Sequence, residues 1–270
     1  MTSPSSHSNT GGTAPTVLAD TIDRVHSVTV IVPTRNESAN VEPLVERVGA
    51  AMATTDWRWD VMFVDDSDDD TPDVVAALEQ AGQHVRLCRR PAGSRSGGLS
   101  GAVLAGFARA NGDVFVVIDG DLQHPPEALP ALLAPLADSS VDLSVATRYA
   151  GAGADVAGLA STYRRIVSRT GRRAVHLLFA KTRSVSDPLG GFFAVRRDVV
   201  EHTALRADGF KILLEVLVRA GWKSIVEVPY KFAERTNGSS KAGWREGVRF
   251  IRQLARLRAT TPLHANGYTR

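Results

Sequence analysis

Two aspartates separated by one glycine are the residues of this chain best suited to chemistry. They are Asp119 and Asp121, and the amide of Gln123 follows two positions later. Carboxylate and amide oxygens form a hard ligand set, which suits Mg²⁺ or Mn²⁺ held by few protein ligands and completed by substrate phosphates. An Asp-Gly pair is also a common turn signal, so the alternative is that both acids are surface turn residues. The pattern favours the metal site, and other segments must decide.

The element that must position these acids is the apolar run that precedes them. Residues 114–118 are all apolar and mostly β-branched, which predicts a strand buried on both faces. In open α/β sheets, ligands bind in the crevice beyond the carboxyl ends of the strands, and Asp119 would lie there. Pro125, Pro126 and Glu127 then stop the strand and begin a helix, with proline in its first turn and an acid near its positive end.

A second strand also ends in acids. Residues 59–64 predict a strand, and five of the six residues from 65 to 70 are aspartates. Because these carboxylates repel one another, the cluster must be solvated or bound to cations and donor groups. We expect the three acids at 68–70 to be solvated, whereas Asp65 and Asp66, at the strand end, are candidates to hold a ligand.

Repeated strand-then-helix units predict the fold. Four apolar runs are typical of buried strands: 28–32, 59–64, 84–88 and 114–118. Each is followed by apolar residues at helical spacing or by a helix start, and no hairpin signal separates them. This order predicts an α/β fold with a doubly wound, mostly parallel sheet flanked by helices.

A glycine-rich loop, residues 91–98, precedes the helix after the third strand. Backbone N–H groups at such a helix start can cradle a phosphate. The spacing differs from that of a P-loop, so we favour the alternative that Gly98, Gly101 and Gly106 allow close packing of the helix.

Positive charge concentrates in the second half of the chain. No acid occurs between Asp155 and Asp187, while seven cations lie there among apolar residues: Arg164, Arg165, Arg169, Arg172, Arg173, Lys181 and Arg183. A cationic amphipathic helix of this kind binds nucleic acid, anionic lipid or only water. Near the end of the chain an apolar stripe adjoins a basic one: Trp244, Val248, Ile251 and Ala255 beside Arg245, Arg249, Arg252 and Arg256. This pattern predicts a basic C-terminal helix at a membrane interface, and packing against the domain with solvated arginines is the alternative.

Composition sets the expected boundaries of the folded part. The 270 residues carry a formal net charge of +3, and 43% are hydrophobic, as in ordinary soluble domains. We expect a disordered tail over 1–26, where Ser, Thr, Gly and Pro dominate, one domain over 27–258 and a second tail over 259–270. No stretch predicts a signal peptide or a transmembrane helix, and the single Cys88 excludes an internal disulfide. These features favour a cytoplasmic protein, soluble or peripheral at the inner face of the membrane.

Seven ordered blocks of residues resemble one family. They are PTRNE at 33–37, VDD at 64–66, DGDLQHPPE at 119–127, TRY at 147–149, DPLGGFF at 187–193, GFKILLE at 209–215, and Arg235 with Lys241. With these blocks, residues 27–258 resemble the family 2 glycosyltransferases of the GT-A fold, and within them the polyprenyl-phosphate (dolichol-phosphate) mannose synthases. A lone Asp-x-Asp motif would be weak support, whereas seven blocks in order are specific.

The resemblance implies a role for each matching residue. The nucleotide base and ribose would be lined by Pro33, Arg35, Glu37, Val64 and Asp66. The metal and the diphosphate would be held by Asp119, Gly120, Asp121 and Gln123, and phosphates would be contacted by Arg148, Arg235 and Lys241. The nucleotide-binding half would span 27–125 and the acceptor half 126–258. The family often has an aromatic residue in place of Arg35 and commonly alanine in place of Gly120.

The resemblance also implies an activity. The expected reaction is metal-dependent, inverting transfer of a hexose, mannose from GDP-mannose, to a polyprenyl or dolichyl monophosphate at the cytoplasmic membrane face. Asp119, Asp121 and Arg148 would be catalytic, with Mg²⁺ or Mn²⁺ on Asp119, Asp121 and Gln123 as a Lewis acid for the departing diphosphate. Many relatives append transmembrane helices, so attachment here would come from the basic surface on anionic lipid or from a separate membrane-anchoring protein.

Three alternatives stay open at this point. The enzyme could use UDP-glucose or another sugar nucleotide, or act on a small-molecule acceptor; a sugar hydroxyl would then need a carboxylate base, for which Asp187 and Glu215 are the candidates. The chain could also be a nucleotide- or nucleic-acid-binding module without catalysis, but it has no recognisable nucleic-acid-binding motif and we expect no such partner. Nucleotidyl transfer would share the metal and the nucleotide but release pyrophosphate.

Overall fold

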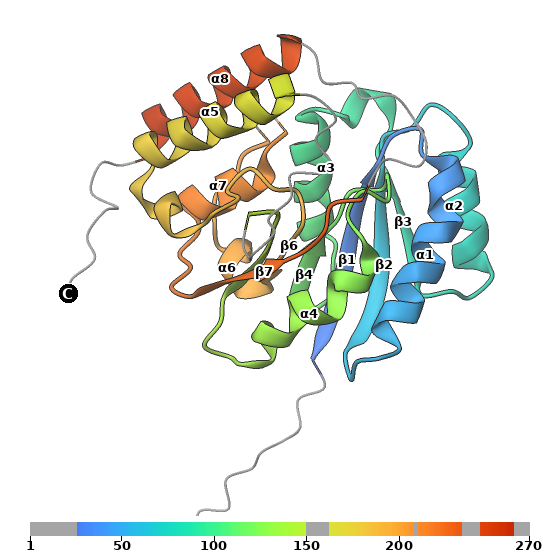
Figure 1. Ribbon diagram of the computed structural model, residues 1–270. Helices are drawn as coiled ribbons and strands as arrows, with labels where there is room; N and C mark the ends of the chain where they lie inside the picture. Colours follow the sequence, from blue (N-terminus) through green and yellow to red (C-terminus); the bar gives the residue numbers. More distant parts are fainter. Residues whose placement is uncertain (1–25, 150–161, 208–209, 234–243, 262–270) are drawn as a thin grey trace, which may run out of the picture.

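The computed structural model describes residues 26–149, 162–207, 210–233 and 244–261 (Figure 1). At 162–169 and 244–246 it describes the backbone alone. Most of the two expected tails lies outside these ranges, as do Arg235 and Lys241. The side chains of Arg164, Arg165, Arg169 and Arg245 are likewise outside the described part.

One mixed sheet forms the centre of the described chain. Its strands are β1 (Ser27–Thr34), β2 (Arg58–Asp65), β3 (Val85–Arg89), β4 (Val114–Val117), β5 (Leu143–Thr147), β6 (Phe193–Arg196) and β7 (Ile225–Pro229). Their spatial order is β3-β2-β1-β4-β6-β5-β7. Only β6 runs against its neighbours β4 and β5, and every other pairing is parallel. The predicted mostly parallel, doubly wound sheet is therefore confirmed, and all strands except β6 end at one common edge.

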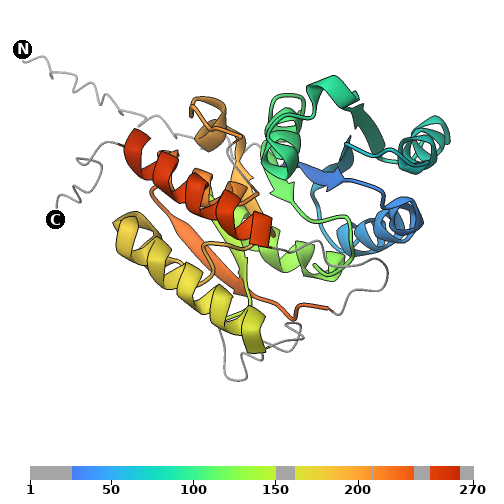
Figure 2. The same ribbon diagram turned by 90° about the horizontal axis from the view of Figure 1, so that it is seen from above.

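Helices cover both faces of the sheet (Figure 2). The α-helices are α1 (Ser38–Met52), α2 (Thr71–Gln80), α3 (Gly98–Phe107), α4 (Leu129–Leu133), α5 (Thr162–Leu178), α6 (Arg197–Glu201), α7 (Ile212–Arg219) and α8 (Trp244–Thr260). Short 3-10 turns are η1 (Ala92–Ser94), η2 (Pro126–Ala128), η3 (Ala134–Ala137) and η4 (Ala180–Ser184). The predicted helix start at Pro126 is confirmed by η2, which leads directly into α4.

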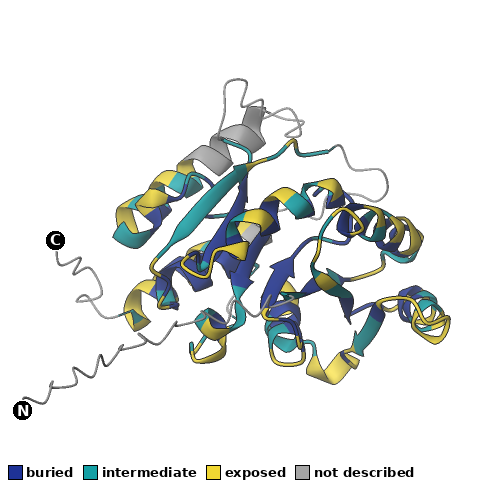
Figure 3. Ribbon diagram, turned by 90° about the horizontal axis from the view of Figure 1, so that it is seen from below, coloured by how far each residue is buried: buried dark blue, intermediate teal, exposed yellow. Residues whose placement is uncertain are grey.

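Alternating side chains of each strand feed two separate cores. Val30 and Val116 point to the face covered by α1 and α4, whereas Ile31 and Val117 point to the face covered by α3 and α7. The central strands are consequently buried from both sides, while the outer faces of the helices are exposed (Figure 3). The prediction that 114–118 is a strand buried on both faces is confirmed for Val114–Val117, with Ile118 also fully buried.

A third core joins α8 and the end of α5 to α7, and the two long helices lie side by side over it (Figures 1 and 2). Leu254 and Leu257 of α8 pack inward against Leu214 of α7. The apolar stripe picked out from the sequence does not face this core, because Val248 and Ile251 are exposed, the latter by 66%. The outer face of α8 thus carries apolar side chains together with the exposed Arg249, Arg252 and Arg256. Among the described helices, none has the length and hydropathy needed to cross a bilayer.

The glycine predictions were partly right. A Cβ at Gly101 would lie 2.1 Å from the Ser96 carbonyl oxygen, and one at Gly106 would lie 2.6 Å from Ile31 Cγ2, so both glycines permit close packing of α3. Gly98 differs, because nothing lies within 4 Å of its Cβ position. Its φ of +53°, after a φ of +76° at Gly97, shows that the turn before α3 uses left-handed backbone there.

Gly106→Ala tests how closely α3 packs against β1. The added methyl group would press on the branched side chain of Ile31, and we expect the free energy of unfolding to fall by about 1 to 3 kcal/mol. Gly49 in α1 is the control, because a Cβ there meets Trp59 at an ordinary 3.6 Å. Gly49→Ala should raise the free energy of unfolding by up to about 1 kcal/mol. Urea denaturation measures both, and equal effects would contradict the close approach of α3.

Candidate active site

The candidate site lies beyond the common edge where β1, β2, β4 and β5 end. Thr34 pairs with Asp65 at the last register position of β1 and β2, and Asp119 follows β4 by two residues. Arg148 directly follows β5. Because β6 is the only strand between β4 and β5, the sheet brings the acids after β4 close to the arginine after β5.

Asp119 and Asp121 differ in exposure. The Asp119 side chain is 35% exposed, whereas Asp121 is buried and its Oδ1 accepts a hydrogen bond of 3.1 Å from the Gln123 backbone N–H. Leu122, between Asp121 and Gln123, has a φ of +60°, so the backbone turns sharply inside the motif. In the described ranges, no three His, Cys, Asp or Glu side chains gather into a closed metal-binding group. The metal roles of Asp119, Asp121 and Gln123 stay predictions, and oxygen donors as few as these would suit an ion whose other ligands come from a substrate.

Gly120 and Gly191 keep the space around these carboxylates small. A Cβ at Gly120 would lie 3.1 Å from Thr34 Cγ2, so alanine would fit there only tightly. A Cβ at Gly191 would lie 3.2 Å from Asp119 Oδ2. The backbone of the turn at 187–191 therefore lies directly against the Asp119 carboxylate.

His124 is a site residue to which the sequence reasoning gave no role. Its Nδ1 lies 3.4 Å from both the backbone N and Oδ2 of Asp119, and its ring contacts the rings of Phe192, Tyr230 and Phe232. Burial lowers the pKa of His124, although the charges of Asp119 and Asp121 oppose that shift. A buried neutral imidazole that accepts the Asp119 N–H would fix the backbone of the motif. In the sequence, only the position of His124 within the block 119–127 could have indicated a role for it.

Arg148 and Asp187 form a two-point ion pair. Arg148 Nε donates to Asp187 Oδ2 at 2.8 Å and Nη2 donates to Oδ1 at 3.2 Å. Burial alone would lower the pKa of Arg148, but Asp187 outweighs this and raises it, so the guanidinium stays charged. The guanidinium also lies 5.4 Å from the centre of the Phe232 ring, and Arg172 of α5 lies 4.5 Å from the ring of the adjacent Tyr149. Two cationic side chains, Arg148 and Arg172, thus lie on the β5 side of the site.

The acids after β2 are held in internal contacts. Asp65 is fully buried and accepts hydrogen bonds from Thr34 and Ser67, while Asp66 accepts two from Arg90, at 2.7 and 2.5 Å. Asp65 therefore fixes the loop and is not positioned to hold a ligand. The acids at 68–70 are exposed as expected, although Asp68 pairs with Arg95.

The other predicted nucleotide residues surround this loop. Arg35 is 65% exposed and lies 3.9 Å from Asp68, and Glu37 accepts a hydrogen bond of 2.7 Å from Asn40. Pro33 is half-buried, whereas Val64 is fully buried in the core, so its side chain is not exposed to a nucleotide. The nucleotide roles of Pro33, Arg35, Glu37 and Asp66 stay predictions.

Glu215, one of the two candidate bases, is turned away from this edge. It is buried in α7, and its Oε1 accepts hydrogen bonds from Arg219 Nε at 2.5 Å and from the Arg206 N–H. Arg219 in turn donates to Thr260 at the end of α8. Asp187, the other candidate, is at the site but is paired with Arg148.

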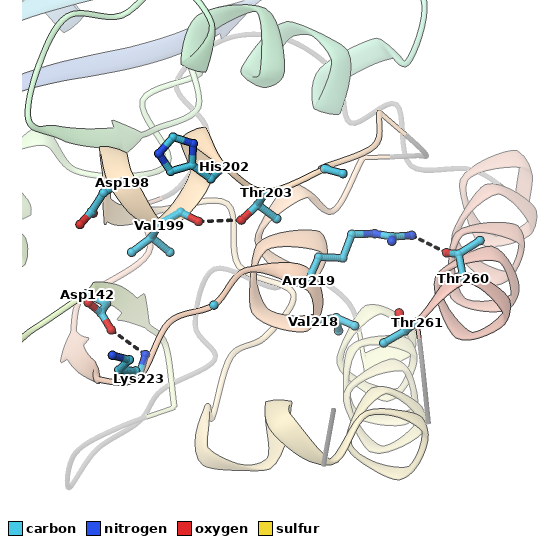
Figure 4. A pocket seen from close by; sticks show the side chains of 12 residues that line it. Asp142, Asp198, Val199, His202, Thr203, Val218, Arg219, Lys223, Thr260 and Thr261 are labelled. Atoms are coloured by element: carbon cyan, nitrogen blue, oxygen red, sulfur yellow. Dashed lines mark hydrogen bonds between the residues drawn. The ribbon is translucent and has the colours of Figure 1, made fainter. Parts of the chain in front are cut away.

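A pocket of about 630 Å³ lies on this other side of the molecule (Figure 4). Arg219, Thr260, His202 and Asp142 line it, and Asp142 accepts hydrogen bonds from the backbone N–H groups of Lys223 and Ser224. Asp142 directly precedes β5, so the pocket lies at the amino edge of the sheet. It is therefore separate from the acids after β4.

Comparisons with known proteins agree with this geometry. A family model described as glycosyl transferase family 2 matches residues 29–203. A dolichol-phosphate mannosyltransferase of Pyrococcus furiosus is 38% identical over 233 residues, which cover 85% of this chain and 63% of that relative, less than two thirds of its length. A protein of the same name from Saccharomyces cerevisiae is 38% identical over 239 residues, covering 84% of this chain and 85% of the relative.

Solved structures confirm the fold. Glucosyl-3-phosphoglycerate synthase from Mycobacterium tuberculosis, solved with Mn²⁺, UDP and glucosyl-3-phosphoglycerate, superposes with a TM-score of 0.63 at 21% identity, covering 91% of this chain and 84% of that one. Mannosyl-3-phosphoglycerate synthase from Rubrobacter xylanophilus gives a TM-score of 0.62 at 19% identity, with coverages of 86% and 73%. The expected GT-A-like architecture is thus confirmed.

Asp187→Asn should test the Arg148 ion pair against an exposed counterpart. The Arg148 and Asp187 side chains are 17% and 3% exposed, whereas Arg47 and Glu127, which also form a two-point pair, are 37% and 58% exposed. Asp187→Asn leaves a buried cation without its partner, so we expect the free energy of unfolding to fall by about 3 to 5 kcal/mol. Glu127→Gln should cost about 1 kcal/mol or less. Similar losses from both variants in urea denaturation would contradict a buried pair.

Proposed function

Because this chain belongs to glycosyl transferase family 2, we propose that it transfers a hexose, mannose from GDP-mannose, to a polyprenyl or dolichyl monophosphate with inversion. The relatives named dolichol-phosphate mannosyltransferase support mannose as the sugar and a dolichyl phosphate as the acceptor. The observation that carries the proposal is the position of Asp119 against the turn that also holds Asp187 on Arg148. A carboxylate that could bind a cation, Asp119, and an arginine that could bind an anion, Arg148, thereby lie in one site.

On the donor side, Asp119, Asp121 and Gln123 would hold Mg²⁺ or Mn²⁺. When bound, the ion supplies Lewis-acid stabilisation of the departing nucleoside diphosphate. The fit rests on the oxygen donor set and on the Asp119 side chain, which is 35% exposed. His124 would keep the Asp119 backbone in place. Arg35, Glu37 and Asp66 would contact the base and ribose, and Arg235 and Lys241 would contact the phosphates.

On the acceptor side, Arg148 and Arg172 would bind the lipid phosphate. Pairing with Asp187 uses two of the five N–H groups of Arg148, and arginine forks match phosphate geometry well. The second pKa of such a phosphate is about 6, so the acceptor is largely dianionic at neutral pH and needs no general base. This agrees with the ion pairs of Asp187 and Glu215, because a carboxylate held by arginine is a poor base.

At the membrane, the outer face of α8 would contact anionic lipid on the cytoplasmic side. It combines exposed Ile251 and Val248 with exposed Arg249, Arg252 and Arg256, which is the composition of an interfacial helix. The exposed Leu177 at the end of α5 extends the same apolar character to the neighbouring helix. A separate anchoring protein is an alternative means of attachment.

The activity assay uses purified protein, radiolabelled GDP-mannose, a short polyprenyl phosphate and Mn²⁺. We expect a lipid-linked radiolabelled product and release of GDP, and Asp121→Asn should lower kcat by about 10²- to 10³-fold through lost stabilisation of the leaving group. Asp198→Asn, at an exposed acid beside the amino-edge pocket, is the control and should leave the rate unchanged. Product formed only from UDP-glucose would replace GDP-mannose as the proposed donor. Product formed only on a small acceptor would replace the lipid phosphate as the proposed acceptor. Release of pyrophosphate, or no product from any sugar nucleotide, would contradict the proposal.

Liposome co-sedimentation tests the α8 surface. Wild type should sediment with anionic vesicles, and charge reversal of Arg245, Arg249 and Arg252 should weaken this about tenfold or more, since each basic residue near the surface contributes about 1 kcal/mol. Charge reversal of Arg58 and Arg109, exposed arginines on β2 and after α3, is the matched control. Equal sedimentation of both variants would exclude α8 as the membrane contact.

A further inference from the structure

Lys211, directly before α7, is a half-buried lysine that has no role in the site as described so far. Its Nζ donates a hydrogen bond of 2.8 Å to the Leu189 carbonyl oxygen and lies 5.0 Å from the centre of the Phe210 ring. Burial lowers the pKa of Lys211 and so does the charge of Arg148, whereas Asp119 and Asp187 act in the opposite direction. The charges of Asp119, Asp187 and Arg148 thus act on the Lys211 ammonium, which is bound to the backbone at Leu189.

The carbonyl that Lys211 binds belongs to the turn at 187–191. This turn is closed by a hydrogen bond of 3.1 Å from the Gly190 N–H to the Asp187 carbonyl oxygen. It presents Asp187 to Arg148 on one side and the Gly191 backbone to Asp119 on the other. A group that fixes Leu189 consequently fixes the distance between the two halves of the site.

The backbone of Lys211 is fixed in turn by α8. Gln253 Nε2 donates a hydrogen bond of 3.1 Å to the Lys211 carbonyl oxygen, and the Gln253 residue is only 2% exposed. The Gln253 amide therefore holds that carbonyl through its N–H, whereas its Oε1 is buried without a hydrogen-bond partner among the described residues. Lys211 is thus held at its backbone by one helix and at its ammonium by the turn.

We propose that Lys211 is a positioning residue that sets the 187–191 turn between the Asp119 and Arg148 sides and offsets the negative charge of Asp119 and Asp187. This inference rests on the proposed function, in which a divalent cation and two phosphate groups enter the same site. A fixed positive charge beside Asp119 weakens the binding of a free divalent cation and strengthens the binding of anionic substrates. Removing the charge must shift these two affinities in opposite directions, which a purely structural contact would not do.

Lys181 provides a matched control within the same chain. Its Nζ also donates to a backbone carbonyl, that of Ala220, at 2.5 Å, and it lies 4.8 Å from the Trp222 ring. Burial lowers the pKa of Lys181 as well, and among the described residues no acid forms an ion pair with it. Lys181→Met therefore removes the same kind of contact without changing the charge near Asp119.

The test compares wild type with Lys211→Met, Lys211→Arg and Lys181→Met. Free Mn²⁺ is measured by electron paramagnetic resonance in the absence of nucleotide, and steady-state kinetics give kcat and both KM values. We expect Lys211→Met to bind Mn²⁺ about 3- to 10-fold more tightly and to raise the KM for polyprenyl phosphate about 10-fold or more, as for a lost charge at a partly buried site. Lys211→Arg should restore both values towards wild type, and Lys181→Met should match wild type.

Each outcome decides the proposal. Unchanged or weaker Mn²⁺ binding by Lys211→Met, or the same shifts in Lys181→Met, would overturn it, as would a wild type that binds no Mn²⁺. If Lys211→Met fails to fold, Lys211→Gln and the charge-preserving Lys211→Arg carry the same comparison. Tighter Mn²⁺ binding by Lys211→Met but not by Lys181→Met, together with no transfer to lipid by wild type, would sustain Lys211 and reject only the proposed acceptor.

Discussion

The site depends on one electrostatic contact, the buried ion pair between Arg148 and Asp187. Arg148 follows β5, and Asp187 begins the turn that leads into β6, the strand inserted between β4 and β5. The pair therefore ties the cationic side of the site to the backbone that lies against Asp119. Because β6 is antiparallel, its entry turn reaches the same edge at which the parallel strands end, and opposite charges can meet there.

The molecule uses its acids in two different ways. Asp65, Asp66, Asp187 and Glu215 are buried and held by donors within the protein, so their charge is already compensated. Asp119 differs because its side chain is about one-third exposed, so an external cation could reach it. The compensated acids shape the site, and the exposed one adjoins the space in which ligands would bind. Buried cations on the acceptor side complete the balance, since two phosphates and two acids would otherwise repel one another.

Much of the architecture could be predicted because strand and helix periods are local signals. The strands around 28–32, 59–64 and 114–118 and the helix start at Pro126 appear where the sequence placed them. The partners of individual side chains could not be predicted, because Arg148 and Asp187 are 39 positions apart and Asp66 and Arg90 are 24 apart. For the same reason, only the packed structure shows that Val64 is buried and that Ile251 faces outward. Only the packed structure also brings His124 and Lys211 to the site. The ligand-binding roles taken from the family resemblance stay predictions.

Calorimetric titration of GDP tests the central claim most directly, namely that oxygen ligands at the sheet edge hold a cation onto the leaving diphosphate. The titration is run on wild type and on Asp121→Asn, each with Mn²⁺, with Mg²⁺ and with a chelator. The account predicts that either ion strengthens GDP binding to wild type by about tenfold or more, because the ion bridges the acids and the diphosphate, and that Asp121→Asn loses this gain. Equal GDP affinity with and without both ions would contradict it.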